Sequence, residues 1–238
     1  MNDWRQLSSD LTAALNLGTP PIAITFGEEA PAGVDPFDAS MPAPTDDGRT
    51  GRVPAGCAFW THAADRTFST VAEDHANCSV GSVTHGFLTL DEAAGRSDVA
   101  TLLETGWVTP EAMAEVPAVR TKPGTVTYGP LRDTPVDPDV VLLRVNGKQL
   151  MVLHDALPAL RIEGKPQCHI IAVAKEHGEP AASVGCALSR VRTGMSATEM
   201  TCAIPAGQLP AVVDAVTATA GLDTTVARYA AEDAQRFS

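Results

Sequence analysis

The segment DVVLLRV at residues 139–145 constrains the fold of this chain more than any other stretch. It has the length of a strand and is almost continuously apolar, which is typical of a strand in the middle of a sheet. Further strands are predicted from short β-branched or apolar runs at 22–26, 68–71, 124–131, 181–187 and 199–205. We therefore expect one main sheet that has 139–145 as a central strand.

Helices are predicted between these strands. In residues 3–17 the apolar side chains, among them Leu7, Leu11 and Leu15, recur at the spacing of one helix face. Further helices are predicted at 101–108, 110–116, 146–160 and 169–177, from residue 209 onwards and over 221–238. Strands therefore alternate with helices in an irregular order. This pattern predicts an α/β fold, a mixed sheet with flanking helices, in a single domain over residues 1–238.

One long segment fits neither pattern. Residues 27–53 are rich in Pro, Asp, Ala and Gly and show no clear hydrophobic period. A loop of this length inside a compact domain is often functional. We predict a long surface excursion and treat it as a candidate lid over the site.

The charge of the chain argues against nucleic acid as a partner. Seventeen basic and 29 acidic residues give a net charge of −12, whereas nucleic-acid binding needs clustered Lys and Arg. No stretch approaches the roughly 18 consecutive apolar residues of a membrane-spanning helix, and the start, MNDWRQLSSDL, does not read as a signal peptide. We therefore expect a cytoplasmic protein with no nucleic-acid or membrane partner. A small-molecule substrate stays open, and no oligomeric state is predicted.

The stretch EDHANCSVGSVTHG at 73–86 contains the main candidate metal-ligating and catalytic side chains. It places His75, Cys78 and His85 within fourteen residues, beside two glycines and few bulky apolar side chains. As a helix, it would hold these three side chains within about 80° of one another, and as a tight loop it would also let them converge. Thiolate and imidazole suit zinc and iron–sulfur clusters. Since the stretch holds one cysteine, a metal site needs thiols from elsewhere, and Cys57 and Cys186 are the natural donors because each follows a glycine.

The remaining cysteines and the two histidines have separate interpretations. Cys202, in the strand-like MTCAI, is interpreted as a core residue, and the role of Cys168 is left open. The carboxylates of Glu73 and Asp74 are expected to favour protonated His75, which would suit an acid beside the metal. His85 has no charged neighbour in sequence and is expected to be neutral, as a metal ligand must be.

Several longer stretches resemble a known family. They are GCAFWTHAADRTFSTVAEDHANCSVGSVTHGF (56–87), GPL…DPDVVLLRV (129–145), GCALSR (185–190) and TEMTCAIP (198–205). The chain is similar in these motifs to an uncharacterised bacterial and archaeal family, domain of unknown function 169. The resemblance implies one intact domain, and it implies no catalytic residue.

The leading hypothesis is a metalloprotein with an iron–sulfur cluster, most simply [4Fe–4S], on Cys57, Cys78 and Cys186. The fourth position would be open or occupied by His85, and His75 would do acid–base work beside it. An open iron would suit non-redox lyase or sulfur-transfer chemistry. Two alternatives stay open: a mononuclear zinc site on Cys and His, structural or hydrolytic, and a metal-free module that binds a small molecule or a partner. The chain contains no G-x-S-x-G, P-loop, H-E-x-x-H or G-x-G-x-x-G motif, so no nucleotide cofactor is predicted.

Overall fold

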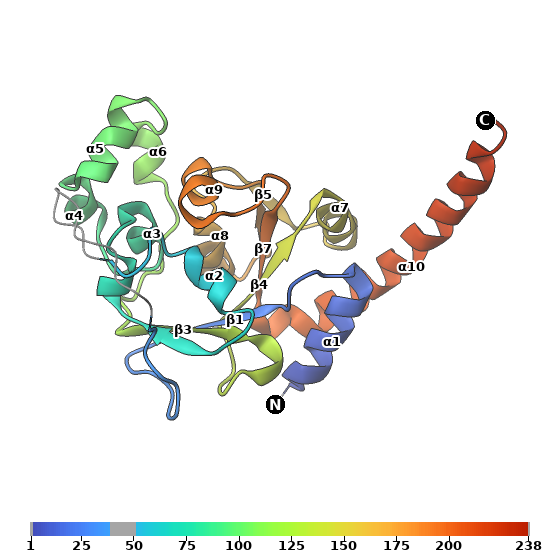
Figure 1. Ribbon diagram of the computed structural model, residues 1–238, viewed down its shortest axis with the longest axis horizontal. Coiled ribbons are helices and arrows are strands. Elements are labelled where there is room, and N and C mark those ends of the chain that lie inside the picture. Colours follow the sequence, from blue (N-terminus) through green and yellow to red (C-terminus); the bar gives the residue numbers. More distant parts are fainter. Residues whose placement is uncertain (1, 39–50, 238) are drawn as a thin grey trace.

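A seven-stranded sheet forms the centre of the computed structural model, which describes residues 2–38 and 51–237 (Figure 1). The strand order is β2-β3-β1-β4-β7-β6-β5, and every neighbouring pair is antiparallel except β5 with β6. The strands are Ile22–Gly27 (β1), Phe68–Thr70 (β2), Thr125–Pro130 (β3), Val140–Val145 (β4), Arg161–Glu163 (β5), Ala181–Ser183 (β6) and Met200–Pro205 (β7). The predicted mixed sheet in one α/β domain is confirmed, with β4 in the middle.

Both faces of the sheet are covered, which explains why β4 is apolar along its length. Val140 and Leu142 pack on one face against helices α2 and α8 and the π-helical turn η3. Val141 and Leu143 pack on the other face against α1, α7 and α10. These elements are Trp4–Leu15 (α1), Ala58–His62 (α2), Gly147–Ala156 (α7), His169–Ala172 (α8), Val173–His177 (η3) and Leu209–Ala234 (α10).

Four short helices form a separate layer at one end of the molecule (Figure 1). They are Ser79–Thr84 (α3), Leu90–Ala94 (α4), Ser97–Glu104 (α5) and Pro110–Ala114 (α6). Thr89 and Thr109 accept hydrogen bonds from the first turns of α4 and α6, which fixes where these helices begin. Val80, Val83 and Leu102 fill a small core of their own between the helices. This layer carries Cys78 and His85 to the side of the sheet that holds α2 and α8.

The remaining elements connect these layers. They are the seven-residue helix Ala187–Thr193 (α9) and the 3₁₀ turns Ala72–His75 (η1), Leu131–Asp133 (η2) and Ala206–Gln208 (η4).

The C-terminal region differs from the sequence-based expectation of two helices. α10 continues without a break through Gly221, and its second half extends away from the body of the protein (Figure 1). Its buried residues, Leu209, Val212, Val213 and Val216, all lie in the first half, so the second half has no core to join. Of the described helices, none is long and apolar enough to cross a membrane.

The predicted excursion at 27–53 is described only at its two ends. Phe37 is buried in the core against Phe59 and Phe68, and Val53 belongs to the same apolar cluster. Residues 39–50 lie outside the described residues, so the lid over the site stays a prediction.

Candidate functional site

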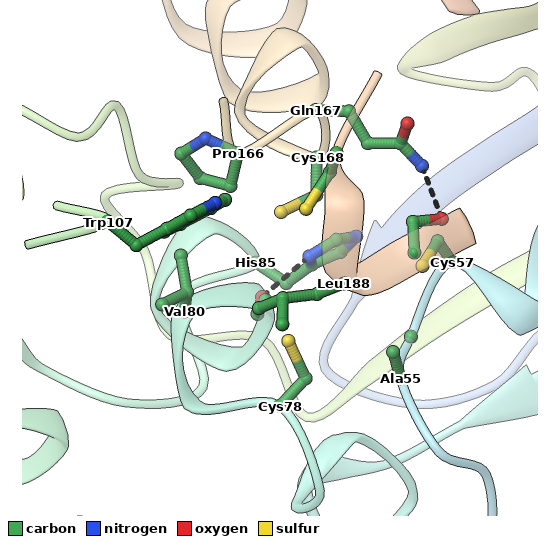
Figure 2. A pocket seen from close by; sticks show the side chains of 14 residues that line it. Ala55, Cys57, Cys78, Val80, His85, Trp107, Pro166, Gln167, Cys168 and Leu188 are labelled. Atoms are coloured by element: carbon green, nitrogen blue, oxygen red, sulfur yellow. Dashed lines mark hydrogen bonds between the residues drawn. The ribbon is translucent and has the colours of Figure 1, made fainter. Parts of the chain in front are cut away.

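Four cysteine side chains line one cavity between α3 of the helical layer and the segments that lead into α2, α8 and α9, and three of them, Cys57, Cys78 and Cys168, are labelled in Figure 2. The four are Cys57, Cys78, Cys168 and Cys186, and each immediately precedes a helix, namely α2, α3, α8 and α9. The structure therefore brings together the three cysteines that the sequence singled out, and it adds Cys168. The fifth cysteine, Cys202, is completely buried in the apolar core on the opposite face of the sheet, as predicted.

The cavity is small and free of charged side chains among the residues described. Its volume is about 30 Å³, which is room for one or two water molecules. Apart from the thiols, the walls come mostly from apolar groups, among them Val80, Trp107, Pro166 and Leu188. A wall of this kind favours small, uncharged or soft ligands and disfavours a phosphate or carboxylate.

Polar groups beside three of the four sulfur atoms favour the thiolate form and lower the thiol pKa. They are the Ser189 hydroxyl for Cys57, the Gly81 backbone N–H for Cys78 and the Thr84 hydroxyl for Cys168. Ser189 is itself held in place by the side-chain amide of Gln167, at 2.8 Å (Figure 2). Hydrogen bonds to sulfur stabilise thiolates and tune a metal cluster that the thiolates hold.

Burial favours the protonated form of three of these thiols. It raises the pKa of Cys57 to about 11 and, more weakly, the neighbouring Cys78 and Cys186 raise this pKa further. The pKa of Cys78 is also raised by burial, and that of Cys168 is raised well above its usual value by burial and then by Cys78. The charges of Cys57, Cys78 and Cys186 each raise the pKa of at least one other cysteine in this set, which indicates that the four sulfur atoms lie close together. A bound cation would reverse these effects and favour the thiolates.

His85 lies within the cavity wall as a neutral imidazole. Its side chain is 2% exposed, and burial lowers its pKa to about 4. Nδ1 stands 2.8 Å from the Gly81 carbonyl oxygen, which can only accept, so Nδ1 carries the ring proton (Figure 2). Nε2 is then an acceptor, and it is buried with no hydrogen-bond partner. This lowered pKa agrees with the expectation that His85 is neutral.

His75 is buried behind this wall, and the structure contradicts its expected protonation. Burial first, and then His85, lower its pKa well below the usual value. The carboxylate of Asp74 turns instead to the Val71 N–H and to Arg52, both at 2.9 Å. His75 packs against His85 with a ring separation of 5.1 Å. Its role in acid–base chemistry stays a prediction, but the carboxylates that were expected to charge it do not serve that purpose.

Tyr128 on β3 is a neighbour that the sequence did not reveal. Its hydroxyl is buried without a hydrogen-bond partner, and burial followed by Cys168 and Cys57 raises its pKa well above the usual value. The hydroxyl thus borders the thiols as a neutral donor. No local motif marks Tyr128, because the strand pattern of β3 only requires that this position be buried.

Within the described residues, no group of three or more Cys, His, Asp or Glu side chains is arranged to hold a single metal ion. The thiols line the wall of a cavity instead of closing on one point. The donor set is nevertheless that of a soft metal centre, with four thiols and one neutral imidazole.

Comparison with known families agrees with the motifs of the sequence. A family model, DUF169 (uncharacterised ArCR), matches residues 10–215. The chain belongs to the DUF169 family. The match begins within α1 and ends within α10, so the projecting half of α10 lies beyond it. Neither the curated proteins nor the solved structures gave a match to this DUF169 protein.

Proposed function

We propose that this DUF169 protein binds an iron–sulfur cluster, [4Fe–4S], in the cavity lined by Cys57, Cys78, Cys168 and Cys186. The observation that carries the proposal is the meeting of these four thiols, from four separate segments of the chain, in one cavity. Four cysteine thiolates are the usual ligands of such a cluster. The reduced thiols also suit the cytoplasmic location predicted from the sequence, which is part of this proposal.

The environment of the thiols supports this choice of cofactor. Polar groups beside three of the sulfur atoms favour their thiolate forms, and the nearby Tyr128 hydroxyl is a buried donor without a partner. The free volume of about 30 Å³ means that the thiol side chains must turn outward when a cluster enters. Cys57 and Cys78 are only partly buried, so their side chains have room to do so.

The fourth corner of the cluster has two candidate ligands. The sequence pointed to an open position or to His85, whereas Cys168 lines the same cavity. We assign the corner to Cys168, because thiolate is the more common ligand of [4Fe–4S] clusters than imidazole. The cavity thus offers five donors for four irons. Lewis-acid chemistry of the lyase or sulfur-transfer kind then requires Cys168 to leave its iron, with a small molecule taking its place.

The proposal is tested by anaerobic purification and reconstitution with iron and sulfide. We expect about four iron and four acid-labile sulfide atoms per chain, with the broad visible absorption of a cluster. Single Cys→Ser variants at the four cavity positions should each lower the iron content. The matched control is Cys202→Ser, which removes a thiol from the opposite face of the sheet and should keep its iron.

Three results would oppose the proposal. One is stoichiometric zinc in place of iron, which would favour the zinc alternative. Another is a wild-type protein that retains no metal under anaerobic conditions, which would favour the metal-free module. The third is an equal loss of iron in Cys202→Ser and in the cavity variants, which would mean that the losses come from misfolding.

A further inference from the structure

His85 presents a buried acceptor that the protein itself leaves without a partner. Its Nδ1 proton is used by the Gly81 carbonyl oxygen, and its Nε2 lone pair has no partner among the described residues. A buried polar atom without a hydrogen bond is costly and rare in folded proteins. The thiolates and sulfides of a closed cluster cannot satisfy it, since they are also acceptors. In the metal-free protein the cavity thiols can donate, but none of them is hydrogen-bonded to this nitrogen. A donor must therefore come from a bound molecule.

A second acceptor lies next to the first. Thr70 donates its hydroxyl proton to the Val126 carbonyl, at 2.9 Å, and so accepts from Nε2 of His75, at 3.1 Å. This leaves His75 Nδ1 as an acceptor, and it too is buried without a partner. Gly56, which lines the cavity, keeps the approach to this atom open, because a Cβ atom there would stand 2.8 Å from it.

The surroundings define what kind of molecule would donate. The cavity has no charged side chain among the residues described, it holds one or two water-sized molecules, and its polar walls are mainly sulfur. These requirements describe a very small, neutral, soft molecule that donates a hydrogen bond.

We propose that the cavity binds a small sulfur hydride, hydrogen sulfide, with His85 Nε2 as its principal acceptor. Bound there, the sulfur lies beside the thiols that would hold the cluster, which is where a ligand replacing Cys168 must arrive. The inference rests on the proposed function for that last step only. The binding site itself is built from protein groups and exists without the cluster.

Isothermal titration calorimetry of the reduced, metal-free protein with sodium sulfide tests the site directly. The titration is done anaerobically at mildly acidic pH, where neutral hydrogen sulfide is the main species and His85 is still uncharged. His85→Asn keeps a donor for the Gly81 carbonyl and removes the acceptor at the position of Nε2. His85→Gln restores an amide near that position. His154→Asn is the control, because His154 is an exposed residue of α7.

We expect saturable binding to the wild type, about fivefold or more weaker binding to His85→Asn, and partial recovery in His85→Gln. His154→Asn should bind as the wild type does. Thermal unfolding of each variant identifies any loss of sulfide binding that is due to misfolding. If His85→Asn is misfolded, the comparison of His85→Gln with the wild type becomes the test. No saturable binding to the wild type, or equal binding to wild type and His85→Asn, would overturn the inference.

The cluster-loaded protein separates this inference from the proposed function. If the wild type takes up no iron, the proposed function fails while the calorimetric result still stands. If it does take up iron, sulfide should change the visible absorption of the wild type and leave that of His85→Asn unchanged, at equal iron content. A loss of iron in His85→Asn would make His85 a cluster ligand and would overturn its role as the acceptor.

Discussion

Alkylation of Cys57 in the reduced, metal-free protein provides a quantitative check on the site. The pKa of this thiol is about 11 in the folded protein, compared with an ordinary value of 9.0. Only the thiolate reacts, so at pH 8 a shift of two units lowers the reactive fraction about 100-fold. A thiolate of higher pKa is intrinsically more nucleophilic, which offsets roughly six- to tenfold over two units. The net expectation is a rate at least about tenfold below that of the unfolded chain, since burial also limits access.

The assay is a time course with iodoacetamide under anaerobic conditions, with mass spectrometry of the peptide that contains Cys57. The same peptide in urea-unfolded protein gives the reference rate. The rate in the folded protein should continue to rise with pH beyond 9 and level off near 11. Cys202, with its pKa raised by burial to about 12, should react still more slowly. Equal folded and unfolded rates, or a plateau near pH 9, would refute the reasoning.

Three further predictions concern the rest of the structure. Gly56→Ala should destabilise the protein by about 1–3 kcal/mol in urea denaturation, because the new Cβ would lie 2.8 Å from His75 Nδ1. At Gly221 in α10 a new Cβ would meet nothing within 4 Å, so Gly221→Ala should stabilise the protein by about 0.5–1 kcal/mol. Arg144→Ala should cost about 2–3 kcal/mol, because it leaves Glu199 without its two charge-assisted hydrogen bonds of 2.6 and 2.9 Å; a double-mutant cycle showing no coupling would contradict this. Iron affinity should rise with pH through the neutral range, by about tenfold per pH unit for each proton released, because thiols with raised pKa values must lose protons to bind metal. An affinity that does not change with pH would count against thiolate ligation.

The sheet and most of the helices could be predicted from the sequence because their signals are local. A continuous apolar run is informative at β4, where both faces of the sheet are covered, and the spacing of Leu11 and Leu15 marks the buried face of α1. Local signals did not reveal β5, which is three residues long and mostly exposed. They also suggested a break in α10 that does not occur, since a single glycine costs a helix only about 1 kcal/mol.

For the site, the sequence by itself determined which cysteines are unusual. Cys78 has polar neighbours, and Cys57 and Cys186 each follow a glycine, so all three could be told apart from Cys202 in its apolar strand. It could not decide Cys168, because whether a thiol beside buried apolar residues faces a core or a cavity depends on segments far away in the chain. Only the tertiary structure places α8 next to α2, α3 and α9, so that Cys168 meets the other three.

The histidines show the same division. The presence of two imidazoles near Cys78 was visible in the sequence, and the uncharged neighbours of His85 suggested a neutral side chain, although burial is what lowers its pKa. For His75, the nearby carboxylates suggested the opposite charge state from the one that burial imposes. Burial outweighs sequence proximity, because the energy of removing a charge from water depends on everything packed around it, whereas a neighbouring carboxylate acts only if its side chain points the right way. Asp74 points to Arg52, and that choice is made by the tertiary structure alone.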